Sequence, residues 1–309
     1  MKKLTTALII VAALPAFANA KTYKEMFGAE PQVDPAAATV LKTMDFKQGD
    51  IPLPGANATL KLPPGYYFLN TADASKVLVN LWGNPPGAAS GTVGMVFPAK
   101  YPPEGQSNWG AVISYAPDGY VSDEDAQSTD FDEVLRQLQQ STDENNAQRK
   151  TDGYEPMKLV GWASPPYYDR NSHALHWARD LLFGTDPTAP HTLNYQLRML
   201  GREGVLELNF VAGMQSLQEI KDSIPQVIGL VNYNGGKKYS DHRDGDKLAA
   251  YGLGGLILAG AGAKIAAKVG FLALALVFLK KGFVFVLIAL GAIFKPIMNF
   301  FRGKSGGEA

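Results

Sequence analysis

The sequence predicts an α+β domain built mostly from antiparallel strands with flanking helices, followed by C-terminal membrane helices. Strand-like segments follow one another directly, helical segments stand between groups of strands, and two long apolar runs follow the last helix. A doubly wound parallel sheet would need strands and helices in regular alternation, which this chain lacks. We therefore expect an α+β domain in the middle of the chain and membrane contact at its C-terminal end.

The N-terminal 20 residues have the layout of a secretory signal peptide. Residues 2–3 are basic, residues 4–14 are apolar, and residues 18–20 read Ala-Asn-Ala, an A-x-A cleavage site. The alternative, an uncleaved N-terminal membrane anchor, is disfavoured because the apolar region is short and is followed at once by a proline. The mature chain is predicted to begin with a lead-in segment at 21–48.

A single exported domain is expected over residues 49–233. Residues 70–83 predict a short amphipathic helix capped near Asn70 or Thr71. Stretches rich in β-branched and aromatic residues, bounded by Gly, Pro or Asp, predict strands, and the glycines of 201–204 predict a hairpin. The strand-like segments are 58–69, which contains a turn, 91–99, 109–120, which ends in an Asp118-Gly119 turn, 157–163, 173–183, 191–200 and 204–212.

Two longer helices complete the domain. Residues 128–150 show apolar side chains at i, i+3, i+4 and i+7, and either Ser128 or Thr129 is placed to cap the helix. Residues 214–231 show a similar periodicity, which predicts a closing helix interrupted at Pro225.

The C-terminal quarter of the chain is predicted to contact a membrane. A polar linker at 234–247 precedes a hydrophobic region at 248–301, and the polar tail 302–309 follows. The first apolar run, 248–267, would extend roughly 30 Å as a helix, about the thickness of the hydrocarbon core. The second run, 269–294, is apolar except for two adjacent lysines near its middle.

The positions of four lysines affect how these two runs are arranged in a membrane. Lys264 and Lys268 follow the first run closely enough to reach the headgroups, whereas Lys280 and Lys281 lie inside the second run. Insertion of the two central lysines into a bilayer costs about 2.5–3.5 kcal/mol each. This cost nearly cancels the total gain from the apolar residues of the run, which contribute about −0.3 to −0.6 kcal/mol each. The second run therefore either crosses the bilayer as half of a hairpin, or lies flat on the cytoplasmic leaflet with its cations toward phosphates.

The charge distribution supports export of the domain. Residues 21–245 contain 27 acidic and 19 basic side chains, a net charge of −8, whereas residues 247–309 contain 8 basic side chains and 1 acidic one. An acidic domain argues against nucleic acid as a partner. A cationic tail is typical of the cytoplasmic side of a membrane. We expect the bacterial inner membrane, with the domain facing the periplasm or cell exterior. The chain has no cysteine, so disulfides and thiol catalysis are excluded.

Aromatic residues accompany four Pro-Pro pairs along the domain. The candidates for ligand binding among them are Trp82, Trp162, Tyr167 and Tyr168. Rigid turns packed against aromatic rings explain the pattern without any ligand, and this is the favoured interpretation. The alternative is a surface on which a sugar or peptide stacks.

The densest collection of ionisable groups lies at 168–180, where Asp169, His173 and His176 are the candidate catalytic residues. If this segment is a strand, the two histidines lie on opposite faces and do not share a metal ion. The chain contains neither a G-x-S-x-G nor an H-E-x-x-H motif, and its partial calcium-loop and phosphate-loop patterns have the wrong spacing. The sequence therefore predicts neither a metal site nor a cofactor.

Six ordered motifs resemble one bacterial family. They are "WGNPPG", "DGYVSDEDA", "LVGWASPPYYD", "HALHWARDLLFG", "HTLNYQLRMLGREGVLELN" and "DKLAAYGLGGLI". Together they resemble the membrane-anchored family known as domain of unknown function 2167, from about residue 49 to the end of the tail. The resemblance implies a signal peptide, an exported domain and a C-terminal membrane segment, and it implies no activity or catalytic residue.

Three functions remain open. The favoured one is a non-enzymatic envelope protein whose partners are the lipid bilayer and an unidentified envelope protein. The second is a hydrolase-like envelope enzyme that uses the residues at 168–180. The third is an oligomeric pore or transport accessory, because Gly255, Ala259 and Ala263 recur at a spacing that lets membrane helices associate into a homo-oligomer.

Overall fold

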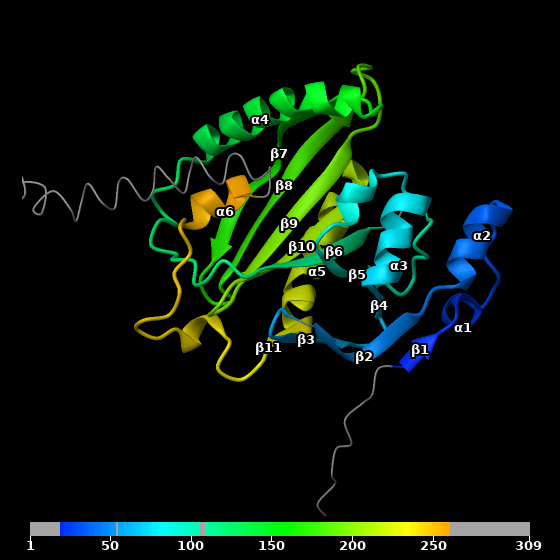
Figure 1. The fold of residues 1–309 in the computed structure, drawn as a ribbon, viewed down its shortest axis with the longest axis horizontal. Helices are drawn as coiled ribbons and strands as arrows, with labels where there is room; N and C mark the ends of the chain where they lie inside the picture. Colours follow the sequence, from blue (N-terminus) through cyan, green and yellow to red (C-terminus); the bar gives the residue numbers. More distant parts are fainter. Residues whose placement is uncertain (1–18, 54, 106–108, 260–309) are drawn as a thin grey trace, which may run out of the picture.

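The computed structural model describes residues 19–53, 55–105 and 109–259 (Figure 1). These residues form one antiparallel sheet of eleven strands, in the order β11-β3-β2-β4-β5-β6-β10-β9-β8-β7, with β1 paired to β2 beside this path. The predicted α+β architecture with a mostly antiparallel sheet is confirmed. The strands are β1 (Asn19–Lys21), β2 (Phe46–Leu53), β3 (Ala58–Leu62), β4 (Tyr66–Asn70), β5 (Thr92–Pro98), β6 (Gly110–Ala116), β7 (Met157–Asp169), β8 (Ala174–Phe183), β9 (Thr192–Leu200), β10 (Val205–Gly213) and β11 (Val231–Tyr233).

Helices cover both faces of this sheet. As predicted, Asn70 caps the third of them, because its side-chain oxygen accepts a hydrogen bond from Asp73 N at 3.0 Å. That helix continues into a π-helical segment at Lys76–Leu81. The α-helices of the described residues are α1 (Tyr23–Phe27), α2 (Pro35–Lys42), α3 (Thr71–Ser75), α4 (Phe131–Thr151), α5 (Leu217–Leu230) and α6 (Leu253–Ala259).

The hairpin of β9 and β10 lies in the interior of the sheet and confirms the turn predicted at 201–204. Its register pairs Leu200 with Val205 and Thr192 with Gly213. Because side chains alternate along a strand, each strand presents one apolar face. The apolar side chains of this face pack against α5, and the largest of them are Leu193, Tyr195, Leu197, Met199, Leu206, Leu208 and Phe210.

Helix α5 is continuous, so the predicted interruption at Pro225 is wrong. Proline lacks an N–H and so loses one hydrogen bond of the helix interior. However, Ile224 and Val227 are both buried in the core beneath α5, and their packing keeps the helix on the sheet. Tertiary contact therefore overrides the local preference of the proline.

Helix α4 begins one residue later than the predicted caps allow. The carboxylate of Asp130 accepts hydrogen bonds from the backbone N–H groups of Asp132 and Glu133, both at 3.0 Å. The prediction of Ser128 or Thr129 as N-cap is therefore wrong, because the Asp130 carboxylate caps the helix and also complements its N-terminal dipole.

The lead-in segment is part of the folded domain. Tyr23, Leu41 and Phe46 are buried in a cluster formed by α1, α2, α3 and strands β2, β4 and β5. The sequence analysis missed β2, because Gly49 and Pro52 interrupt the apolar alternation that identifies a strand. Strand β1 includes the two residues that precede the predicted cleavage point.

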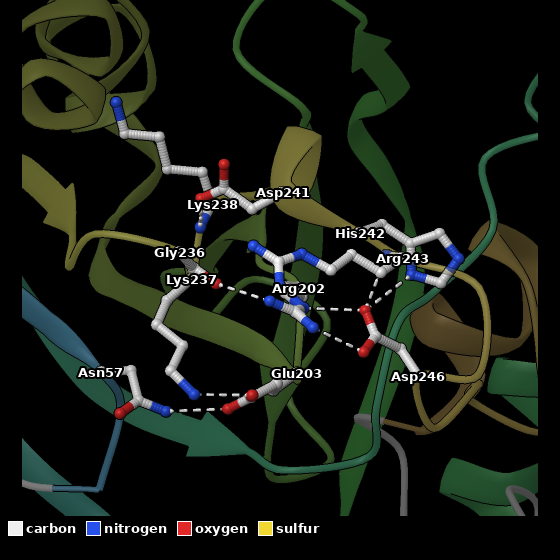
Figure 2. A network of polar contacts seen from close by, with 10 residues as sticks. All are labelled: Asn57, Arg202, Glu203, Gly236, Lys237, Lys238, Asp241, His242, Arg243 and Asp246. Atoms are coloured by element: carbon white, nitrogen blue, oxygen red, sulfur yellow. Dashed lines mark hydrogen bonds and ion pairs between the residues drawn. The ribbon is translucent and has the colours of Figure 1, made fainter.

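The segment expected as a linker, 234–247, is held to the β9–β10 hairpin by ion pairs (Figure 2). The guanidinium of Arg202 donates two hydrogen bonds to the Asp246 carboxylate, both at 2.7 Å. Lys237 Nζ lies 2.6 Å from Glu203 Oε1. A bidentate Arg–carboxylate pair fixes geometry as well as charge, so this segment has a defined position on the domain.

Helix α6 also belongs to the domain, whereas the sequence placed its residues at the start of the membrane run 248–267. Leu253, Leu256 and Ile257 are each 1% exposed and pack in the cluster that contains α4 and Trp177. The apolar surface between α4 and the sheet requires a cover, and α6 supplies it. Within the described residues, no helix has both the length and the apolar character needed to cross a bilayer.

Replacement of Leu256 by alanine tests whether α6 is a core helix. We expect the free energy of unfolding to fall by about 2–5 kcal/mol, because the change leaves a cavity in a buried site. Leu248→Ala is the matched control, since Leu248 is 63% exposed and its loss should change stability by less than about 0.5 kcal/mol. Denaturant unfolding followed by tryptophan fluorescence measures both. Equal, small effects would contradict the docking of α6.

Asp246→Asn tests the ion pair that holds the linker segment. Hydrogen bonds from Arg202, and then from the backbone of Arg243, lower the pKa of Asp246. A carboxyl whose pKa is lower in the folded state stabilises the protein above its unfolded pKa, about 3.9, and this contribution is lost as the pH falls. The stability difference between wild type and Asp246→Asn should therefore be largest near neutral pH and shrink below about pH 4. Asp244→Asn is the matched control, because Asp244 is an exposed neighbour whose replacement should change stability by less than about 0.5 kcal/mol near neutral pH.

Candidate functional site

The structure does not bring the candidate catalytic residues Asp169, His173 and His176 together. Asp169 closes the β7–β8 turn, where its carboxylate accepts a hydrogen bond from Ser172 Oγ at 2.6 Å that lowers its pKa. His176 lies on the α5 side of the sheet, with its Nδ1 2.7 Å from Tyr195 Oη, and burial lowers its pKa. His173 immediately precedes β8. Its ring contacts Tyr168 and Tyr239, which belong to the cluster on the side of the sheet opposite α5. Among the described residues, no group of three or more histidine and acidic side chains is arranged to hold a metal ion.

His173 is the end of a hydrogen-bonded chain. Tyr168 Oη donates to Asp123 Oδ2 at 2.9 Å, and His173 Nδ1 lies 3.3 Å from the same phenol oxygen. A hydroxyl has a single proton, so a phenol that donates to Asp123 accepts from His173, whose Nδ1 therefore carries a proton. Burial, and then the Asp123 hydrogen bond, raise the pKa of Tyr168. In neutral His173 this arrangement leaves Nε2 as a hydrogen-bond acceptor.

Stacked rings hold this end of the sheet together. The His173 ring lies 4.3 Å from that of Tyr239, which stacks on Tyr120 at 4.5 Å, and Tyr120 stacks on His242 at 3.8 Å. Tyr239 Oη also donates to Val121 O at 3.0 Å. The stack joins the β7–β8 turn, the segment after β6 and the segment 234–247, which are far apart in the sequence.

A cleft of about 360 Å³ opens beside His173. Its apolar lining comes from the end of β9, the end of α5 and the start of β11. Its polar lining comes from the β7–β8 turn, β11 and the turn at 238–240. The lining residues are Asn171, Ser172, His173, Met199, Leu200, Ile228, Val231, Asn232, Tyr233, Lys238, Tyr239 and Ser240. None of them is acidic, although the domain as a whole is.

Of the four aromatic candidates for ligand binding, Trp82 lies apart from the other three, and Tyr167 and Tyr168 line one surface pocket. Trp82 Nε1 donates to Pro103 O at 3.0 Å, and its ring packs on Phe97 in the cluster under α1–α3. Trp162 and Tyr168 pack in a different cluster, the one beneath α4 and α6. Tyr167 is 59% exposed on the edge strand β7. Trp82 therefore shares no surface with the other three.

A buried polar layer is the feature that sequence analysis missed. On the face of the sheet covered by α4 and α6, β9 presents Asn194, Gln196 and Arg198, none more than 7% exposed. Asn209 Oδ1 accepts hydrogen bonds from Asn194 and Gln196, both at 2.6 Å, and Arg179 Nη2 donates to Asn194 Oδ1 at 2.5 Å. Polar residues that alternate with apolar ones indicate a solvent-facing side, so the sequence alone gives no sign of their burial.

This polar layer contains two arginines and one carboxylate. Arg198 Nε lies 3.2 Å from Glu207 Oε1, and its guanidinium is 5.4 Å from the centroid of the Trp177 ring. Burial, together with the charge of Arg198, lowers the pKa of Arg179 to about 10. Both guanidinium groups remain charged at neutral pH, so the layer carries an excess of positive charge.

Several buried polar atoms of this face lack a hydrogen-bond partner. They are Trp162 Nε1, Trp177 Nε1, Gln196 Oε1 and Arg198 Nη1. Arg198 Nε forms an ion pair with Glu207 but is not aligned for a hydrogen bond. An unpaired buried polar group costs about 1–3 kcal/mol. The layer is therefore a costly part of the fold, and Trp162 is the one predicted ligand-binding residue that borders it.

The lysines proposed for membrane contact, Lys264, Lys268, Lys280 and Lys281, lie outside the described residues. Of the three small residues proposed for self-association, Gly255 is buried within the domain and Ala259 ends α6. The third, Ala263, also lies outside the described residues.

The fold and this site define a class of protein: an α+β domain with one large antiparallel sheet, helices on both faces, and a cleft at one end whose lining has no acidic residue. The chain belongs to the family described as "Protein of unknown function (DUF2167)", whose profile matches residues 32–291. The predicted family resemblance is thus confirmed.

Other proteins add little to this assignment. No curated protein matches the sequence. Among solved structures, the chain is similar to the solution structure of cyanobacterial PsbP (CyanoP) from Synechocystis sp. PCC 6803, with 9% sequence identity over 58% of this chain and 88% of that chain and a TM-score of 0.32. A similarity at this level carries no inference about function.

Glu207→Ala tests the energetic role of the polar layer. Removal of this carboxylate leaves Arg198 buried without its counter-ion, and we expect a loss of about 3 kcal/mol in the free energy of unfolding. Glu203→Ala is the matched control. Its pair with Lys237 is shorter, 2.6 Å against 3.2 Å, but Glu203 is 43% exposed and Glu207 only 24%. We expect a loss of no more than about 1 kcal/mol for the control, and the opposite ranking would contradict the buried layer.

Proposed function

We propose that this protein is a membrane-anchored bacterial envelope protein. In this proposal a C-terminal apolar segment holds it at the inner membrane, and the α+β domain faces the periplasm or cell exterior as a binding or scaffolding module. The observation that carries the proposal is that few residues separate the last helix of the domain core from the apolar run that follows it. Only residues 260–268 separate α6 from the run at 269–294.

The burial of α6 in the domain supports a membrane segment that begins after this helix. Its four buried aliphatic side chains contribute about 1.5–3 kcal/mol each in the domain core. Because the domain core already buries these side chains, 269–294 is the remaining apolar run of sufficient length to cross a bilayer.

The charges that flank this segment favour a single crossing. Residues 269–294 exceed the roughly 20 residues that a membrane helix needs. A crossing that begins outside the cell membrane places Lys295, Arg302 and Lys304 in the cytoplasm, in agreement with the usual distribution of cations. Lys280 and Lys281 then need a polar partner inside the bilayer. This requirement makes self-association, or a partner membrane protein, part of the proposal.

The attachment of segment 234–247 to the domain supports a scaffolding role. The Arg202–Asp246 pair and the aromatic stack hold this segment in place, so the domain is joined to its membrane segment by a short connection. A domain held in this way stands close to the bilayer surface, where it can position a partner relative to the membrane.

Single cysteines test the topology, since the chain has none of its own. The reagent is a thiol label that does not cross the inner membrane, applied to whole cells whose outer membrane has been made permeable. It should label Ser90→Cys, which lies on an exposed loop of the domain. Ser305→Cys should be labelled only after lysis. Labelling of both from outside would contradict a single crossing, because both ends of the segment would then lie on the outer side of the membrane. A full-length product that is soluble in the cytosol, with its first 20 residues intact, would refute the proposal.

Chemical crosslinking of the same membrane preparation, after extraction in a mild detergent, tests the binding role. A stoichiometric partner or a homo-oligomer is the expected product. Arg202→Ala is the informative variant, because it frees segment 234–247 and should weaken a crosslink that depends on the position of the domain. A strictly monomeric protein without partners would count against scaffolding.

A further inference from the structure

We propose that the cleft beside His173 binds a small anion that carries a phosphate or carboxylate group, with Lys238 as its counter-ion. This site is independent of the membrane attachment proposed above. It uses only residues of the described domain, and it does not involve the buried polar layer.

The cleft has the size and composition of a small-molecule site. Its volume of about 360 Å³ falls in the range of roughly 300–1,000 Å³ that is typical of ligand pockets. Buried Met199 and Leu200, together with half-buried Ile228 and Val231, form an apolar floor. Hydroxyl, amide and basic groups surround this floor, so a ligand with an apolar part and a charged head matches the lining.

The charges around the cleft favour an anion. Within the described part of the chain, no carboxylate lies within salt-bridge distance of Lys238 Nζ, whereas the neighbouring Lys237 is paired with Glu203. Figure 2 shows the Lys238 side chain extending away from the Arg202–Asp246 pair. The nearest acid in sequence, Asp241, accepts a hydrogen bond from the backbone N–H of Lys238 and is not part of the cleft lining. A free cation in an otherwise acidic domain attracts an anionic ligand.

His173 supplies the second polar contact. Its φ angle of +49° is rare for a residue other than glycine, and strained conformations of this kind cluster at functional sites. The hydrogen-bonded chain through Tyr168 to Asp123 fixes the ring and keeps the proton on Nδ1. Nε2 is left to accept a hydrogen bond from a ligand hydroxyl or a protonated acid group.

Equilibrium dialysis of the full-length protein in a neutral detergent tests this proposal. The probes are inorganic phosphate, sn-glycerol 3-phosphate and succinate. At least one should bind saturably, and Lys238→Ala should weaken that binding about tenfold, the loss of one charge-assisted hydrogen bond. Lys237→Ala, which removes an equal charge one residue away, should leave binding within about twofold.

His173→Asn provides an independent measurement, because asparagine tolerates a positive φ and the variant should fold normally. We expect it to weaken binding of sn-glycerol 3-phosphate, which offers hydroxyl donors, more than binding of inorganic phosphate. Vesicles of phosphatidylglycerol, compared with phosphatidylcholine, distinguish a lipid headgroup from a free anion as the source of the charged group. Equal losses in Lys237→Ala and Lys238→Ala, or no saturable binding of any probe or vesicle, would overturn the proposal.

Discussion

The structure depends on burial of the central strand β9 on both of its faces. Every residue from 193 to 200 is buried, although Asn194, Gln196 and Arg198 are polar. Leu193, Tyr195 and Leu197 form the core against α5, whereas Gln196 and Arg198 are covered from the other side by the cluster of α4 and α6. The polar side chains of a covered face need hydrogen-bond partners within the protein, and the neighbouring strands supply partners for only some of these polar atoms. The fold thus accepts several unpaired polar atoms in exchange for a closed second layer.

The need to cover that face explains why the end of the domain and the start of the apolar tail are one structural unit. Within the described residues, helix α6 packs on the apolar surface between α4 and the sheet, and the segment 234–247 leads into it. Arg202 holds that segment through Asp246, and the Tyr120–Tyr239 stack adds a second attachment. A disturbance at the β9–β10 turn is therefore expected to reach α6, and with it the connection to the proposed membrane segment.

The cleft beside His173 arises from the same arrangement. The β7–β8 turn, the end of α5 and the 238–240 turn meet there because the sheet brings both hairpin ends to one side. Buried ring contacts position His173, whereas Lys238 stays exposed at the rim. This combination of a fixed acceptor and a mobile cation suits a site that must bind and release a small charged molecule.

Local patterns were sufficient for β3 to β10 and for the family, but not for β1, β2 and β11. The alternation at 191–200 and 204–212 predicts the β9–β10 hairpin correctly, because a period of two reports which side chains share a face. That pattern does not say whether the polar face meets solvent or a second layer, so Gln196 and Arg198 could not be recognised as buried. Likewise, the apolar character of Leu256 indicates that it avoids water, but a bilayer and a protein core satisfy it equally. The sequence by itself determined most of the strands, the two long helices, the antiparallel class and the apolar character of the tail. Only the tertiary structure decided what covers each face, because burial depends on contacts between segments that are distant along the chain.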